Sequence, residues 1–185
     1  MQQDKIQKAA QQLAASCKKS SNASERRGAL VVLDQKPPVG DNTTIMLYAA
    51  KLRATDEQKP TAYFSLGTPS IKVVNRLLAI TTGISQEKID SGQLDDKEWK
   101  QLDERLPQLT SAPLYIDDTP AMPIAELKQK LTDLLETAGV RLAIIDHAEQ
   151  LTAKGQPADT AYITAHAKAI AEQLGITIIT ILDKD

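Results

Sequence analysis

Short apolar runs alternate with longer amphipathic stretches along most of the 185-residue chain. The runs are continuous and mostly aliphatic, as is typical of strands buried on both faces of a parallel sheet. They predict strands at 29–33, 61–66, 113–117, 140–146 and 176–182. The stretches between them repeat apolar residues every three or four positions, which predicts helices at 43–54, 69–79, 95–109, 123–138 and 160–174. Strands alternating with helices indicate an α/β fold, a mainly parallel sheet with helices on both faces.

Local signals place several helix ends. Thr68 suits an N-cap and Pro69 suits the first helical position. Gly139 and Gly175 follow apolar helical patterns and predict helix ends. The helix at 95–109 carries one apolar face, formed by Trp99, Leu102, Leu106 and Leu109.

Residues 2–19 form a separate pattern that predicts an N-terminal amphipathic helix. Residues 20–27 (SSNASERR) have linker composition, so the chain divides into a helix and linker at 1–27 and a body at 28–185. The apolar stripe is narrow and rich in alanine, which suits docking on a larger surface. We expect it to pack on the body or on a neighbouring molecule through Ile6, Ala9, Leu13 and Cys17.

Composition limits the classes of function. Aromatic residues make up 3% of the chain, so the core must be aliphatic. The net charge of −2 gives no general case for nucleic-acid binding. The charge is uneven, because residues 1–27 hold six Lys or Arg against two Asp or Glu, and the rest carries about −6. The single cysteine excludes an internal disulfide and fits a reducing cytosol, so we expect a cytoplasmic protein. The sequence has no apolar run of membrane-spanning length.

Candidate chemistry is expected at the carboxyl ends of the strands, where open α/β sheets bind ligands. Residues 31–44 (VVLDQKPPVGDNTT) run from a strand through a loop into a helix, the frame of a P-loop, G-x-x-x-x-G-K-[ST]. On that frame Gln35 and Gly40 stand at the glycines, Asp41 at the lysine and Asn42 at the hydroxyl. An aspartate about 5 Å from a phosphate charge would repel it by about 3 kcal/mol at an effective dielectric near 20. From the residues alone, an ordinary turn before a helix explains this loop equally well.

The other strand ends offer further candidates. Residues 143–146 are three apolar residues and Asp146, which fits the Walker B pattern whose aspartate holds Mg²⁺. Asp117 and Asp118 could ligate a metal, although a capped turn explains them better. His147 beside Asp146 could form an acid–base pair, but the sequence offers no nucleophile, which favours a hydrogen-bonded strand-end histidine. His166 lies among apolar helical neighbours and suggests a packed or exposed residue without a role.

Separate segments together resemble the RecA-like motor domain of DnaB-type replicative DNA helicases. They are GALVVLDQKPPVGDN at 28–42, YFSLGTPS at 63–70, NRLLA at 75–79, IDSGQLDDKEWKQL at 89–102, APLYIDDTPAMPIAELK at 112–128 and LAIIDHAEQL at 142–151. The resemblance covers the chain from about residue 28 to residue 185. It implies a RecA-like P-loop NTPase fold, an ATP and Mg²⁺ site, and a role in DNA replication. It also implies that the chain stops before the family's DNA-binding loop and arginine finger, and lacks the primase-binding domain.

The departures from the family's pattern affect the nucleotide site. Asp41 replaces the Walker A lysine, and Asn42 replaces the magnesium-binding threonine, beside Thr43. Gly67 stands at the catalytic glutamate and Asp183 at the γ-phosphate sensor glutamine. His147 and Glu149 replace a tyrosine and a glutamine, and Asp146 alone is retained. The resemblance therefore predicts a degenerate Walker A loop, the loss of ATP and Mg²⁺ binding, and no catalytic or metal-ligating residues.

Three functions follow as hypotheses. The favoured one is a pseudoenzyme, a non-catalytic structural, regulatory or assembly partner in replication that forms an oligomer with itself or with another helicase-like protein through its N-terminal helix. The second is a nucleotide-binding helicase fragment with an atypical P-loop that uses Lys36 or Thr43. The third is a single-stranded DNA binder, which the negative body and the scarcity of aromatic residues weaken. We expect Asp41, Gly67, Asp117, Asp146 and Asp183 to gather at the carboxyl edge. The carboxylates of Asp41, Asp146 and Asp183 should attract a bare cation or a partner's arginine.

Overall fold

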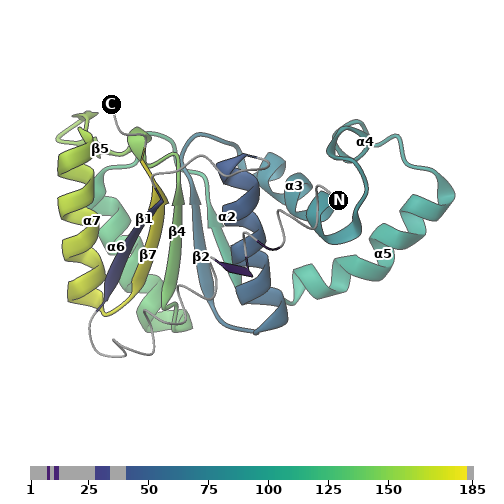
Figure 1. Ribbon diagram of the computed structural model, residues 1–185, viewed down its shortest axis with the longest axis horizontal. Helices are drawn as coiled ribbons and strands as arrows, with labels where there is room; N and C mark the ends of the chain where they lie inside the picture. The colour runs from purple at the N-terminus through teal and green to yellow at the C-terminus, as the bar shows by residue number, and fades with distance from the viewer. Residues whose placement is uncertain (1–7, 9–10, 13–27, 34–40, 183–185) are drawn as a thin grey trace.

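A computed structural model describes residues 8, 11, 12, 28–33 and 41–182, and its centre is a parallel sheet (Figure 1). The strand order is β1–β7–β4–β2–β3, and every pairing in this sheet is parallel. Its strands are β1 (Ala29–Leu33), β2 (Thr61–Ser65), β3 (Leu114–Asp117), β4 (Leu142–Asp146) and β7 (Thr177–Ile181). A separate antiparallel hairpin joins β5 (Thr152–Ala153) to β6 (Gln156–Pro157).

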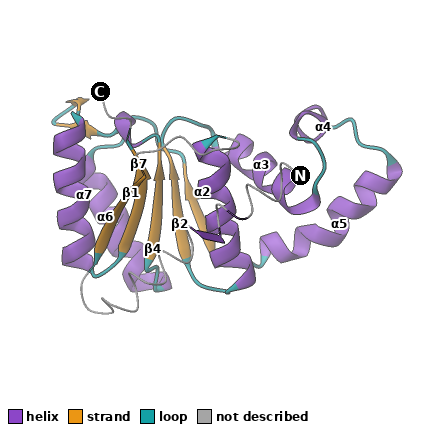
Figure 2. Ribbon diagram, in the orientation of Figure 1, coloured by secondary structure: helices purple, strands orange, loops and turns teal. Residues whose placement is uncertain are grey.

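Helices connect the parallel strands and lie on both sides of the sheet (Figure 2). The α-helices are α2 (Asn42–Lys51), α3 (Ser70–Thr82), α4 (Gln86–Ser91), α5 (Asp96–Thr110), α6 (Ile124–Ala138) and α7 (Thr160–Leu174). A π-helical turn, η1 (Leu52–Asp56), extends α2, and a 3₁₀ turn, η2 (Ala148–Gln150), follows β4. No helix in the described part of the chain is long and apolar enough to cross a membrane.

Two aliphatic cores lie on opposite faces of the sheet. Because side chains alternate along a strand, Phe64 and Ile145 face the core that also contains α6 and α7. Tyr63 and Ile144 face the other core, against α2 and α3. Strands β2 and β4 are buried along their whole length, which explains their continuous apolar sequences.

Gly28 lets β1 approach α7 closely. A Cβ atom at Gly28 would lie 1.6 Å from the carbonyl oxygen of Ala171, so no side chain fits at this position. The glycine therefore fixes the edge strand against the helix that covers it.

The structure confirms the α/β fold class and most of the expected elements. Helix α7 has the predicted bounds, 160–174, and α6 begins one residue after the predicted start. Both helices end at the expected glycines, Gly139 and Gly175, which adopt left-handed conformations. The five predicted strands all form, within two residues of their expected ends.

Several expectations at the helix level need correction. Pro69 is the N-cap of α3 rather than its first helical residue, and α3 extends to Thr82. The last turn of the helix predicted at 43–54 is π-helical. Helix α4 and the β5–β6 hairpin have no counterpart in the sequence-based prediction. The apolar face expected on α5 is only partly packed: Leu109 packs against the core, but no residue of α5 is fully buried, and Trp99 and Leu106 are exposed.

The N-terminal helix predicted at 2–19 lies mostly outside the described residues. Lys8, Gln11 and Gln12 are helical. Ile6, Ala9, Leu13 and Cys17 are outside the described residues, so their packing stays a prediction.

Candidate functional site

The first feature of the carboxyl edge is Asp41, which stands at the start of α2. Its side chain accepts a hydrogen bond from the Thr44 backbone N–H at 2.8 Å and therefore caps the helix. The same oxygen, Oδ1, lies 3.1 Å from a guanidinium nitrogen of Arg76 on α3. A carboxylate that belongs to the chain thus occupies a helix N-terminus that could otherwise attract an anion. Asn42 and Thr43 follow as the first residues of α2.

Asp146 ends β4 and is 3% exposed. The hydroxyl of the buried Tyr63, on the neighbouring strand β2, donates a hydrogen bond of 2.9 Å to Oδ2 of Asp146. Burial, followed by the charge of Asp146, raises the pKa of Tyr63 well above its ordinary value. The tyrosine therefore stays protonated and satisfies one oxygen of a carboxylate that would be costly to bury without a partner.

The charges of this edge are close enough to influence one another. Arg76 lowers the pKa of Tyr63 and Asp41 raises it, although both effects are smaller than those of burial and Asp146. Arg76 also donates a 3.2 Å hydrogen bond to the side chain of Gln86. Asp41, Arg76, Tyr63 and Asp146 consequently form a local network in which the chain supplies its own cation.

Gly67 follows β2 and lies against His147. A Cβ atom at Gly67 would come within 2.8 Å of Cγ and 3.1 Å of Cβ of His147. The His147 ring lies 3.0 Å from Oε1 of Glu149 through Nδ1, and its backbone is left-handed, with φ of 59°. His147 thus fills the space into which a side chain at Gly67 would project.

Asp117 ends β3 and Asp118 follows it, and both side chains accept hydrogen bonds from backbone N–H groups. Asp117 accepts hydrogen bonds from Lys130 at 2.6 Å and from the Thr119 backbone at 3.0 Å. Burial raises the pKa of Asp117, but these hydrogen bonds outweigh it and hold the pKa below its ordinary value. Asp118 accepts a 2.6 Å hydrogen bond from the Ser70 backbone, at the start of α3. These contacts are those of a capped turn, as the sequence analysis favoured over a metal site.

The strand register brings several predicted positions to one edge. Ser65 pairs with Asp146 and Phe64 pairs with Asp117, so Gly67, Asp117 and Asp146 lie at the same ends of neighbouring strands. Asp41 joins them through its contact with Arg76 and its effect on Tyr63. Gln35, Gly40 and Asp183 lie outside the described residues.

Two residues of the network escaped the sequence analysis. Tyr63 was part of an apolar strand, although a tyrosine in a fully buried run signals that its hydroxyl needs a partner. Arg76 lies in the NRLLA segment, and its spacing from Asp41 gave no signal. Arg76 of the same chain already pairs with Asp41, and the attraction of a partner's arginine or a bare cation to this edge stays a prediction.

Two polar groups at this edge form hydrogen bonds within the chain. The N–H of Thr44 bonds to Asp41, and Oδ2 of Asp146 bonds to Tyr63. Among the residues that the structure describes, no group of three or more His, Cys, Asp or Glu side chains could hold a metal ion. The geometry is that of a hydrogen-bonded and ion-paired edge.

The parallel sheet, the helix α2 that follows β1 along the chain and the aspartate that ends β4 are the features expected of a RecA-like fold. Comparison with known protein families identifies one family within this fold class. The model of the DnaB-like helicase C terminal domain family matches residues 22–183. The chain therefore belongs to this family.

Individual relatives agree with the family match. The replicative DNA helicase DnaC of Bacillus subtilis (strain 168) is 27% identical over 161 residues, which cover 84% of this chain and 35% of the relative. The replicative DNA helicase DnaB of Geobacillus stearothermophilus is 26% identical over 161 residues, 84% of this chain and 35% of that protein. The chain thus spans about a third of the length of these relatives.

A solved structure of the ATPase domain of G40P has the same fold. Its TM-score is 0.73 at 20% identity, and the match covers 84% of this chain and 57% of that one. A DnaB-like replicative helicase whose interactions with primase were studied gives a TM-score of 0.68 at 19% identity, over 84% of this chain and 38% of that one.

Proposed function

We propose that this chain is a DnaB-type helicase-like protein that does not bind or hydrolyse ATP and acts in DNA replication through protein contacts. The observation that supports the proposal is a set of contacts within the chain among the described residues at the carboxyl edge of the sheet. Asp41 accepts a hydrogen bond from the N–H of Thr44 and forms an ion pair with Arg76. Tyr63 bonds to Asp146, and His147 fills the space beside Gly67. These contacts stabilise the fold without a ligand.

The two other functions have less support. An atypical P-loop would need a cation or hydroxyl to replace the lost lysine. Lys36 lies outside the described residues, and Thr43 sits beside an aspartate that already caps the helix. Single-stranded DNA binding would draw on a positive groove lined with aromatic residues, whereas the body beyond residue 27 is negative. We also propose a cytoplasmic location. Its support is the single cysteine, which fits a reducing compartment.

Isothermal titration with ATP and Mg²⁺ tests the proposal. We expect no binding with a dissociation constant below about 50 μM, an affinity that corresponds to about 6 kcal/mol. Tighter binding would contradict the proposal, and its loss in the Lys36→Ala or Thr43→Ala variant would favour the atypical P-loop. Titration of a fluorescent oligothymidine at low and high salt tests the third function, because binding through phosphate contacts weakens steeply with salt.

The surface of α3 and α5 supports a role in protein contact. Ile71 on α3 is 64% exposed, and Trp99 on α5 is 47% exposed. Val74 on α3 and Leu106 on α5 are also exposed. We call these four residues the α3–α5 patch. These side chains lie on two helices that contact each other, and exposed apolar side chains that gather on one surface suggest an interaction site.

Charge and apolar surface together favour the N-terminal segment as the occupant of the α3–α5 patch. Helix α5 carries four acidic residues (Asp96, Glu98, Asp103 and Glu104) against three basic ones (Lys97, Lys100 and Arg105), a net charge of −1, whereas residues 1–27 carry six Lys or Arg against two Asp or Glu. The predicted N-terminal helix, which is basic and has an apolar stripe, complements a slightly acidic helix with exposed Trp99 and Leu106. We propose that the N-terminal helix of one molecule docks on the α3–α5 patch of another.

Removing residues 1–20 is expected to reduce self-association, which light scattering after size-exclusion chromatography measures. Trp99→Ser should have the same effect in the full-length chain, because burying about 100 Å² of apolar surface contributes about 2.5 kcal/mol. Tyr162→Ser is the control, since Tyr162 is similarly exposed but lies on α7, at the opposite end of the molecule (Figure 1). An unchanged oligomeric state in both the truncated chain and Trp99→Ser would contradict the docking.

A further inference from the structure

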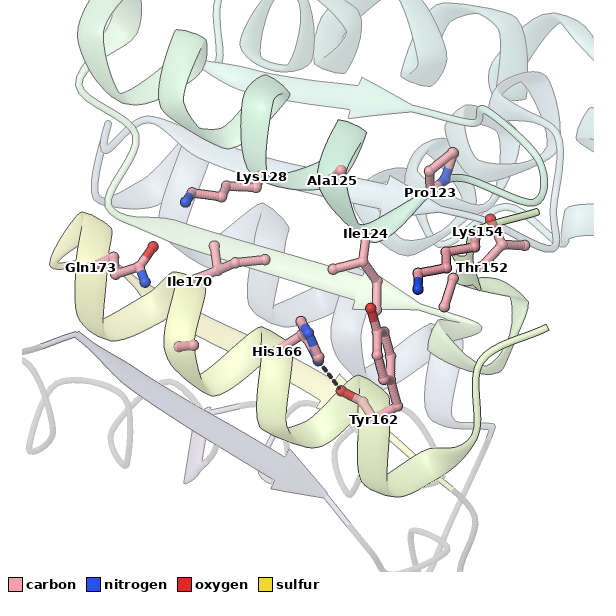
Figure 3. Close-up of a pocket in the computed structure, with 12 residues that line it drawn as sticks. Pro123, Ile124, Ala125, Lys128, Thr152, Lys154, Tyr162, His166, Ile170 and Gln173 are labelled. Atoms are coloured by element: carbon pink, nitrogen blue, oxygen red, sulfur yellow. Dashed lines mark hydrogen bonds between the residues drawn. The ribbon is translucent and has the colours of Figure 1, made fainter. Parts of the chain in front are cut away.

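A groove of about 360 Å³ lies between α6, α7 and the β5–β6 hairpin, on the face of the sheet opposite to α2 and α3 (Figure 3). On α7 its lining runs from Tyr162 to Gln173, a span of about 16 Å at the rise of an α-helix. Nothing in the proposed loss of catalysis involves this groove. Its length suits a segment of polypeptide better than a compact small molecule.

The hairpin at one end of the groove is held firmly. The Thr152 backbone N–H donates to the Met122 carbonyl at 3.0 Å, and the Thr152 hydroxyl donates to the Ala121 carbonyl at 3.1 Å. The turn of the hairpin is Lys154–Gly155, with φ of 51° and 79°. Such turns favour Asn or Asp before the glycine, and here the position is a lysine.

Two lysines give the groove a positive charge. Lys128 from α6 and Lys154 from the hairpin both line it, and neither has an ion-pair partner within the described ranges. No Asp or Glu is among the lining residues. In a chain whose net charge is −2, this local excess of cations favours a negatively charged occupant.

The floor of the groove is aliphatic. Ile124 and Ile170 form part of it and are largely buried, with Ala125 and Ala169 beside them. Tyr162 and His166 stack on each other with 3.8 Å between their ring centroids, and they flank the floor on α7 (Figure 3). An apolar side chain can therefore be buried between the two cationic positions.

We propose that this groove binds an acidic segment of a partner protein. Carboxylates of the segment pair with Lys128 and Lys154, and an apolar side chain between them packs on Ile124 and Ile170. The chain's own N-terminal helix does not fit, because residues 1–27 are basic. The aliphatic floor and the presence of only two lysines favour a peptide over a nucleic-acid strand, whose grooves combine many cations with stacked aromatic residues.

Fluorescence anisotropy with a designed probe tests the inference on the full-length chain. The probe is a short fluorescein-labelled peptide with a glutamate at each end and leucines between them. In a matched control peptide, glutamines replace the glutamates. A labelled oligothymidine represents nucleic acid. We expect saturable binding of the acidic peptide alone, with an affinity that falls as salt rises.

Charge reversal identifies the site. The Lys128→Glu/Lys154→Glu variant should weaken binding of the acidic peptide by about tenfold or more, since each exposed pair contributes up to about 1 kcal/mol. Lys168→Glu is the matched control, because Lys168 is exposed on α7 and does not line the groove. Thermal melting of each variant confirms folding.

Each remaining outcome contradicts the inference. No saturable binding of the acidic peptide below about 1 mM would remove its basis, since this affinity corresponds to only about 4 kcal/mol. Equal binding of the glutamine peptide would show that the lysines do not select charge. Equal loss in Lys168→Glu would show a general effect of charge. Binding of the oligothymidine that disappears in the Lys128→Glu/Lys154→Glu variant would assign the groove to nucleic acid.

Discussion

The Asp41→Lys/Asn42→Thr variant is expected to bind ATP·Mg²⁺ about tenfold or more tightly than the unmodified chain, without hydrolysing it. The substitution removes a carboxylate from the N-cap of α2 and returns the cation and the hydroxyl of a P-loop. It also frees the Thr44 N–H and Arg76, both of which contact Asp41 now. Titration calorimetry measures the affinity, and phosphate release measures turnover.

The expected gain is smaller than the sequence suggests. A bare aspartate about 5 Å from phosphate would cost about 3 kcal/mol. The structure shows that the Asp41 side chain is 58% exposed and paired with Arg76, so solvent and the guanidinium both weaken the repulsion. About 1.4 kcal/mol, or tenfold, is therefore the expected minimum.

Asp56→Lys is a control for the change in charge. Asp56 lies at the far end of the same helical segment, where it pairs with Lys51. The control should leave nucleotide affinity unchanged.

Because Asp41→Lys also removes a helix cap, we expect it to lower the free energy of unfolding by about 1 kcal/mol. Hydrolysis by Asp41→Lys/Asn42→Thr would contradict the view that Gly67 leaves the site without a general base.

The fold could be predicted because its pattern is local. The strand β4 is a continuous apolar run that ends in Asp146, and α7 has a regular apolar face between Asp159, its N-cap, and Gly175. Helix α4 was missed because six residues are too few to show a helical period. The exposure of α5 was missed because an apolar stripe looks the same whether it meets the core or solvent.

The candidate site was predictable in position but not in its contacts. Strand ends gave Asp117, Asp146 and Gly67, since parallel strands bring their carboxyl ends together. The partners come from distant parts of the sequence. Arg76 lies 35 residues from Asp41, and Tyr63 lies 83 residues from Asp146. Such pairs follow from the packing of α3 on α2 and of β2 on β4, which the sequence pattern does not specify.

Gly67→Glu is expected to lower the free energy of unfolding by about 1–3 kcal/mol, because a side chain there overpacks against His147. The clash involves Cβ of His147 as well as its ring, so rotation of the ring alone does not relieve it. Gly67→Ala should therefore cost nearly as much as Gly67→Glu. Urea unfolding followed by circular dichroism measures both changes.

His147→Gly should remove most of this cost. Glycine accepts the left-handed backbone at position 147 without strain, and it vacates the space beside Gly67. We expect the Gly67→Glu/His147→Gly pair to show a coupling energy of about 1–2 kcal/mol, whereas independent substitutions add within about 0.5 kcal/mol. Additive effects would show that His147 does not exclude a side chain at Gly67. Coupling would mean that a carboxylate introduced at position 67 alone lowers the free energy of unfolding, because His147 occupies the space that its side chain needs.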